Sequence, residues 1–232
     1  MFLTSLLVDL TQADEEIDFE DTLNILVGPA KKSFQVPKNL LCERSAFFKA
    51  ACGGRWQQEG TGIISLPEDC PNFFSAYLQI LFRNEVTLSS DGGATIRGLS
   101  SVYVLADKLC DLVAANLVMD AIVLRLKSTQ CRGAPAPGTT RFIYDHTLIY
   151  HPLRRVRVEH CAIVIRKRAQ ERVLRNRDTP RAFVEDVAVF STNSNLRRVH
   201  RKLRFLDRPS SKWHITESSG TSSEHGVANT IT

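Results

Sequence analysis

Basic side chains in the second half of the chain are the residues whose number and spacing most favour joint chemistry. Six of them fall on one stretch that is expected to be helical: Arg154, Arg155, Arg157, Arg166, Lys167 and Arg168. Guanidinium and ammonium groups pair with phosphate oxygens, so this set predicts contacts to a nucleic-acid backbone that weaken as salt rises. The stretch lacks interleaved aromatic residues for base stacking, and no zinc finger or helix-turn-helix pattern is present. A solvated cationic surface is the alternative interpretation, because most charge runs have that role.

Histidine, cysteine and glycine show none of the spacings that catalysis or metal binding requires. His146, His151 and His160 have no serine or cysteine nucleophile on a recognisable elbow, so we expect them to pack or to face solvent. The six cysteines include no Cys-x-x-Cys pair, which predicts reduced thiols and no zinc site; they are Cys42, Cys52, Cys70, Cys110, Cys131 and Cys161. No glycine-rich segment has the context of a phosphate-binding loop. We therefore expect no enzymatic activity, no metal and no cofactor.

Two further residues have reactive side chains but are expected to serve the fold. Asp107 precedes Lys108 on a predicted helix, and we expect its carboxylate to form a hydrogen bond that holds neighbouring elements together. Cys42 has apolar helical neighbours, so we expect its thiol to pack rather than to react.

The charge of the chain is divided unevenly between its two halves. Residues 1–127 carry 11 basic and 16 acidic side chains, a net of −5. Residues 128–232 carry 19 and 9, a net of +10, and the two halves give the whole-chain charge of +5. Such an asymmetry predicts two regions with different partners.

The N-terminal segment is apolar without the features of an export signal. Leu3, Leu6, Leu7 and Leu10 have helical spacing, which predicts a short amphipathic helix or an arm that docks on a partner. The segment has no basic start and leads into an acidic stretch, so we expect no secretion. No apolar run reaches the length of a membrane span. We expect an intracellular protein of the nucleus or cytoplasm, and Arg201–Arg204 is a candidate nuclear import signal.

The first half alternates short strands with helices, which predicts an α+β domain. Strands are expected at 22–27, 32–36 and 62–66, with a stub at 86–88 and a loop at 89–95; helices are expected at 38–43, 46–52, 69–82, 99–109 and 112–126. Ser45 and Asp69 are the predicted caps of the second and third helices, and Asn84 is expected to turn the chain. The last helix of this half has apolar residues on two faces, so we expect both faces to be buried.

The second half is predicted to be helical at first and disordered later. Helices are expected at 141–150, 153–173 and 181–190, after a Gly- and Pro-rich linker. The chain thus divides into an N-terminal arm (1–19), a folded domain (20–127), a linker (128–139), a basic helical extension (140–190) and a mostly disordered tail (191–232).

Several blocks in the first half resemble the BTB/POZ domain, in the order that this family has. Phe34–Phe48 is similar to its hairpin "F-x-V-H-K" followed by "L-L-x-x-R-S-x-F-F", and Val104–Leu109 is similar to its "L-A-D-K-L" helix. The whole most resembles the short BTB proteins of filamentous fungi. Pro37 stands where the family usually has histidine, and Arg83-Asn84-Glu85 replaces a turn that usually contains glycine.

The resemblance implies a BTB/POZ fold, with a small mixed sheet of short strands and about five surrounding helices. It also implies homodimerisation through Lys38–Cys52, with Leu3–Leu10 as a further element. For many members it implies binding to a cullin scaffold of ubiquitin ligases, and here the region for that contact is Leu66–Phe82. The interaction residues that it suggests are Leu40, Leu41, Arg44, Phe47, Phe48 and Lys49. Adjacent Phe47 and Phe48 point about 100° apart on a helix, so we expect one in the core and the other within reach of a partner. The alternative is that both belong to the core.

Overall fold

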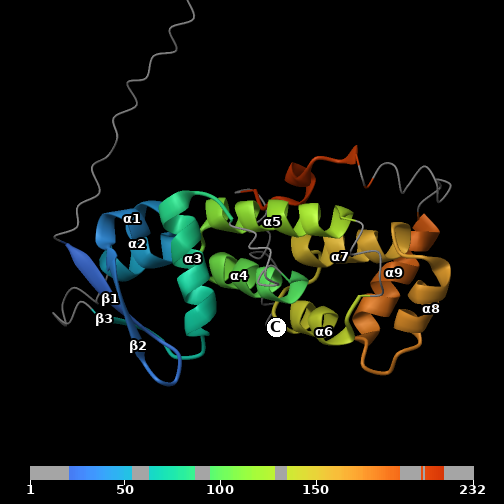
Figure 1. The fold of residues 1–232 in the computed structure, drawn as a ribbon, viewed down its shortest axis with the longest axis horizontal. Coiled ribbons are helices and arrows are strands. Elements are labelled where there is room, and N and C mark those ends of the chain that lie inside the picture. Colours follow the sequence, from blue (N-terminus) through green and yellow to red (C-terminus); the bar gives the residue numbers. More distant parts are fainter. Residues whose placement is uncertain are drawn as a thin grey trace, which may run out of the picture.

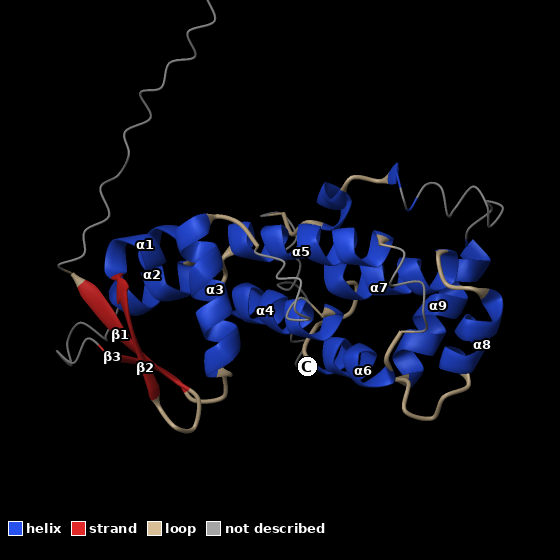
Figure 2. Cartoon of the chain, viewed as in Figure 1, coloured by secondary structure: helices blue, strands red, loops and turns tan. Residues whose placement is uncertain are grey.

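The computed structural model describes residues 21–53, 63–86, 95–128, 135–193, 205 and 207–216. The N-terminal arm, the strand stub after Val86, most of the 89–95 loop and the candidate import signal lie outside these residues. The molecule is elongated, with the sheet at one end and the last helices at the other (Figure 1). Helix is the prevailing structure of the described chain (Figure 2).

A three-stranded mixed sheet lies at the N-terminal end, which confirms the predicted α+β class. β1 (Thr22–Val27) is central, β2 (Lys32–Pro37) pairs with it antiparallel, and β3 (Ile63–Leu66) pairs with it parallel. Alternate residues of β1 are buried, because successive strand side chains point to opposite faces. Gly28 begins the hairpin at φ 78°, and a Cβ there would meet Pro71 at 3.1 Å, so glycine is required.

Two short helices follow the hairpin as predicted. α1 spans Lys38–Arg44 and α2 spans Ala46–Gly53. Ser45 separates them, and its hydroxyl accepts the amide of Phe48 at 3.2 Å, which confirms it as the N-cap of α2. The same hydroxyl donates to the carbonyl of Leu109 at 2.5 Å and so fixes the helix pair to the end of α4 (Ile96–Lys108).

The third helix begins one residue later than a cap at Asp69 would require. α3 spans Pro71–Arg83 and has Cys70 at its N-cap, so the prediction for Asp69 is wrong. The carboxylate of Asp69 instead pairs with Lys108 at 2.8 Å. Pro71 favours the first helical position because proline has no amide hydrogen to leave unpaired there. The helix ends at Asn84, whose φ of 52° confirms the predicted turn.

α4 (Ile96–Lys108) and α5 (Leu112–Lys127) form the centre of the molecule. Thr95 and Asp111 accept amide hydrogens from the first turns of α4 and α5, respectively. The prediction that α5 is buried on both faces is wrong, because Val113 and Leu124 are exposed. Its broad inner face still buries eight residues, among them Val118, Met119 and Ile122.

The extension forms four helices, with bounds that differ from those predicted; the first packs against α4, the second against α5, and the last against the first two. α6 spans Pro137–Asp145 and so begins inside the expected linker, since Pro137 is a favourable first helical residue. The helix expected over 153–173 is two helices, α7 (Pro152–Ile163) and α8 (Lys167–Leu174). The break follows the β-branched run Ile163–Ile165, whose residues have reduced helix propensity. α9 (Arg181–Asn193) contains the predicted helix at 181–190.

Part of the segment expected to be disordered is ordered and buried. Ser210–Trp213 forms a 3-10 helix, and the side chains of Trp213 and Phe205 are fully buried. The expectation of a mostly disordered tail therefore fails for residues 207–216, which we name the C-terminal strap. No helix among the described residues is long and apolar enough to cross a lipid bilayer.

Candidate interaction surfaces

The surface predicted on α1 and α2 is smaller than the sequence suggested. Leu41 and Phe48 are fully buried and Arg44 is largely turned inward, so their assignment as partner contacts is wrong. Lys49 is exposed, and Leu40 and Phe47 are half-buried. Of the adjacent phenylalanines, Phe48 is fully buried in the core, and Phe47 is half-buried and packs against the same core.

Arg44 belongs to a buried polar network that joins α1, α3 and α5. Its guanidinium lies 3.4 Å from the carboxylate of Asp111, which is completely buried, and 3.3 Å from the side-chain oxygen of Asn84. The hydroxyl of Tyr77 donates to the other oxygen of Asp111 at 3.2 Å. Burial, and then the neighbouring Asp111 carboxylate, raise the pKa of Tyr77, so its hydroxyl stays protonated and donates. Arg44 and Ser45, which belong to the block that resembles the BTB/POZ signature, therefore stabilise the fold through these contacts.

Phe47 is the aromatic residue that α2 presents outward. Its ring packs edge-to-face on Phe48 with the centroids 5.2 Å apart, so the core side chain fixes its orientation. Lys49 is exposed two residues further on, and half-buried Leu40 lies on the neighbouring α1. These three residues are what remains of the predicted interaction set. A partly uncovered aromatic ring that is held by the core has the chemistry of a protein contact, whereas Lys49, two residues from Phe47, points to another side of α2.

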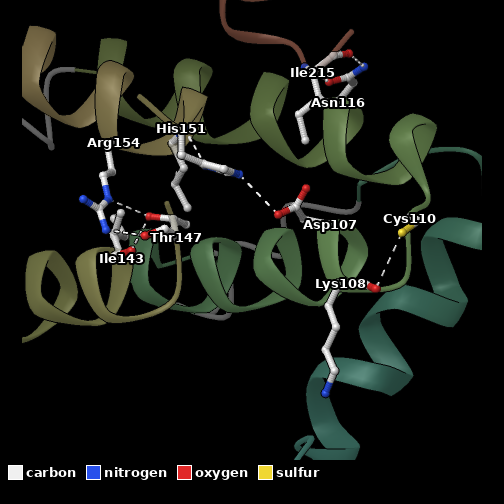
Figure 3. A network of polar contacts seen from close by, with 10 residues as sticks. Asp107, Lys108, Cys110, Asn116, Ile143, Thr147, His151, Arg154 and Ile215 are labelled. Carbon is white, nitrogen blue, oxygen red and sulfur yellow. Dashed lines mark hydrogen bonds and ion pairs between the residues drawn. The ribbon is translucent and has the colours of Figure 1, made fainter. Parts of the chain in front are cut away.

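His151 and Asp107 link the first half of the molecule to the extension (Figure 3). The Nε2 atom of His151 lies 3.2 Å from a carboxylate oxygen of Asp107 on α4. Its Nδ1 atom accepts the amide of Leu153 at 3.3 Å and so caps α7, which places the ring proton on Nε2. This geometry confirms the structural role predicted for Asp107. His151 is thus held by two polar contacts, one at each ring nitrogen.

The predicted nucleic-acid set is divided by the fold. Arg154 donates to the carbonyl of Tyr144 at 2.7 Å and to both the carbonyl and the hydroxyl of Thr147, and Arg157 is 5% exposed. The assignment of Arg157 is therefore wrong, because the residue is buried, whereas half-buried Arg154 is largely engaged with oxygens of its own chain. Arg155 is exposed on α7, and the exposed triplet Arg166–Arg168 belongs to the start of α8. Cations at a helix N-terminus are disfavoured by the helix dipole.

His146 and His160 differ in exposure, and two of the described cysteines have protonated thiols. His146 is exposed and its Nδ1 lies 2.8 Å from the carbonyl of Phe142, whereas His160 is buried near Phe205. Burial raises the pKa of Cys161 to about 11, and burial with neighbouring Cys52 does the same for Cys42. Both thiols are therefore protonated at neutral pH. In the part of the chain that the structure describes, no cluster of three or more potential ligands could hold a metal ion.

An exposed apolar patch on the extension was missed by the sequence reasoning. Leu148, Ile149 and Tyr150 are 82%, 72% and 87% exposed, and Val189 of α9 is 58% exposed. Ile149, Tyr150 and Val189 border a cavity of about 370 Å³ between α7 and α9. The sequence placed the three consecutive residues inside a helix. Pro152, which disfavours helix in the residue before it, was the available sign that they form a loop.

The C-terminal strap is the second feature that sequence reasoning missed. It lies against α5 and α7 (Figure 1). Two aromatic residues in a polar tail, Phe205 and Trp213, were the available signal, since such side chains gain most from burial. The chain matches no protein-family model and no curated protein.

Proposed function

We propose that the chain is a non-enzymatic protein-interaction module with a BTB/POZ-type domain at 20–127 that homodimerises through α1 and α2. The observation that carries the proposal is Phe47, an aromatic ring held rigidly by the core yet left partly uncovered on α2. A contact between two copies around a twofold axis would place this patch against itself. Aromatic residues fixed by their neighbours lose little entropy on binding, which makes them effective anchors.

The arrangement of elements supports the same proposal. Between residues 21 and 127 the described chain forms a mixed sheet in the order β2-β1-β3 together with the five helices α1–α5. The blocks that resemble the BTB/POZ family fall on β2, α1, α2 and α4. The turn at Asn84 survives without glycine because asparagine adopts the left-handed conformation there.

The mass of the full chain in solution tests this proposal. We expect a dimer by light scattering at tens of micromolar, and a monomer for Phe47→Asp, because the introduced carboxylate would be desolvated in the contact. Leu124→Asp is the matched control, since Leu124 is an exposed apolar residue on α5, and it should remain dimeric. A monomeric wild-type chain, or a Phe47→Asp variant that stays dimeric, would contradict the proposed surface.

An adaptor role for a cullin-type ubiquitin ligase is the more specific form of this proposal. The region expected to make that contact, Leu66–Phe82, includes Phe82, a large side chain that is 48% exposed at the end of α3. We expect a purified cullin N-terminal region to bind the wild-type chain and to bind Phe82→Asp at least about tenfold more weakly. Failure of the wild-type chain to bind would remove the adaptor role but not the dimer.

Nucleic-acid association through the extension is the less supported alternative. Four of the six predicted cations remain exposed: Arg155, Arg166, Lys167 and Arg168. If they contact phosphates, affinity for duplex DNA must fall steeply between low and moderate salt. Because Arg157 is buried and Arg154 donates to a main-chain carbonyl, α7 does not present a continuous row of basic side chains for this function.

A further inference from the structure

The C-terminal strap lies against α5 and α7, which hold it in the way that a receptor holds a peptide. We call the surface of α5 and α7 that the strap covers the groove. The side-chain amide of Asn116 donates to the carbonyl of Ile215 at 3.1 Å and accepts the amide of the same residue at 2.8 Å (Figure 3). A side chain that satisfies both main-chain groups of one residue replaces a neighbouring β-strand. Such a contact recognises the backbone of a segment and does not depend on its side chain.

Further contacts along α5 follow the same face of the helix. Asp120 lies 2.5 Å from Nε2 of His214, and the ammonium of Lys127 donates to the carbonyl of Arg208 at 2.5 Å. Asn116, Asp120 and Lys127 are four and seven residues apart, so they form one stripe. Asn116 and Lys127 bind main-chain atoms of the strap. On the other side of the groove, Glu159 of α7 pairs with the guanidinium of Arg208 at 2.7 Å.

Side-chain specificity in the groove comes from aromatic burial and one ion pair. Trp213 is fully buried, with its ring centroid 5.4 Å from that of Phe205. Its indole nitrogen is buried without a hydrogen-bond acceptor among the described residues. The site therefore selects the shape of an aromatic ring and leaves its polar atom unsatisfied, which weakens the hold of the strap.

Chain connectivity does not oblige the strap to remain in this groove. Residues 194–204 join the end of α9 to Phe205, and eleven residues can span up to roughly 35–40 Å. A tethered segment competes with free ligands through its high local concentration. Displacing it requires a partner that reproduces the same main-chain and aromatic contacts.

We propose that this groove is a peptide-recognition site, occupied in cis by the chain's own strap and open in trans to partner peptides of the same chemistry. The partner segment carries an arginine for Glu159, an aromatic residue five positions later and, two positions further on, a residue whose backbone pairs with Asn116. This inference rests on the proposed interaction function and names the class of partner. The strap acts as an internal competitor for that partner.

The probe is a fluorescent synthetic peptide of residues 205–216, added to the full chain. Ile215→Pro in the chain removes the amide that Asn116 accepts, so the strap should compete less and the peptide should bind at least about tenfold tighter than to wild type. In this background, Asn116→Ala should weaken binding about tenfold, as should N-methylation of Ile215 in the peptide. Leu124→Ala, on an exposed position of α5, is the matched control and should have no effect.

A second measurement uses the wild-type chain, in case Ile215→Pro impairs folding. Excess peptide should accelerate hydrogen exchange at the amides of Lys212–Ile215 in an isotopically labelled chain, because the bound peptide displaces the strap. Absence of this acceleration together with absence of binding to Ile215→Pro would overturn the proposal. Binding that is indifferent to the N-methyl group or to Asn116→Ala would overturn it as well. The mass measurement tests only the dimer through α1 and α2, and the peptide experiments test only the groove on α5 and α7. Failure of the proposed dimer is therefore distinguishable from failure of the proposed peptide site.

Discussion

At the scale of single residues, a left-handed backbone conformation identifies a position where glycine would be more stable than the residue present. Cys110 lies in the turn between α4 and α5 with a φ of 54°, and its side chain is exposed. A left-handed conformation costs a residue with a Cβ about 1 kcal/mol, whereas glycine adopts it freely. The turn is fixed by the amide of Asp111, which donates to the carbonyl of Ala106 at 3.0 Å, so the conformation is retained whatever residue stands there.

We therefore expect Cys110→Gly to raise the free energy of unfolding by about 1 kcal/mol. Urea denaturation in a reducing buffer measures the change. Cys70→Gly is the matched control, because Cys70 is an exposed cysteine with a φ of −85°, where glycine gains nothing and adds entropy to the unfolded chain. Equal effects of the two substitutions would show that loss of a thiol, and not backbone conformation, determines the result.

The buried thiol of Cys161 predicts a loss of stability at alkaline pH. Burial raises its pKa to about 11 from 9.0, so the folded state keeps the proton after the unfolded chain has lost it. The contribution of this group is fully present below pH 9 and is lost as pH rises toward 11, by at most about 2 kcal/mol. Unfolding free energies measured from pH 8 to pH 10 should fall more steeply for the wild type than for Cys161→Ala. Equal slopes would refute the assignment.

At the scale of elements, the sequence predicted the helices and strands whose ends carry local signals. The hairpin turn at Gly28, the cap at Ser45 and the turn at Asn84 all hold because each depends on a single backbone conformation or hydrogen bond. The division of 153–173 was not predicted, since its apolar periodicity continues through the break. The sequence also did not predict that Arg44 and Arg154 would bind groups within the fold. The partner of Arg44, Asp111, is distant in the sequence, and Arg154 donates to a main-chain carbonyl.

The polar network around Asp111 should dominate the stability of the α1–α3–α5 junction. Removing one partner of a buried ion pair leaves the other uncompensated, so Asp111→Ala should cost about 3 kcal/mol of unfolding free energy. Asp111→Asn should cost less, because an amide oxygen can still accept the amide of Ala114 that caps α5. Asp69→Ala is the control: its ion pair with partly exposed Lys108 should contribute less than about 1 kcal/mol. Urea denaturation of the three variants should give the largest loss of unfolding free energy for Asp111→Ala. Any other order would contradict the prediction.

At the scale of the whole molecule, the extension is bound to the first half by contacts that a linker would not provide. Asp107 on α4 holds His151 at the start of α7, and α5 packs against α7. Arg97 on α4 stacks on Phe142 of α6 at 3.9 Å and donates to the carbonyl of Gly138. One continuous cluster of buried apolar residues runs from β1 to α9 and the strap. These contacts join regions that composition and charge had separated.

This continuity predicts that the two halves unfold in a single cooperative transition. Ile25→Ala in the sheet and Phe183→Ala in α9 remove fully buried side chains near opposite ends of the core, at a cost of about 2–5 kcal/mol each. Calorimetry should show one peak with equal calorimetric and van't Hoff enthalpies, and both substitutions should shift that same peak. Val189→Ala, at an exposed position of α9, should leave it in place. Two peaks, each sensitive to only one of the core substitutions, would mean that the contacts across α4, α5 and α7 are too weak to couple the extension to the sheet.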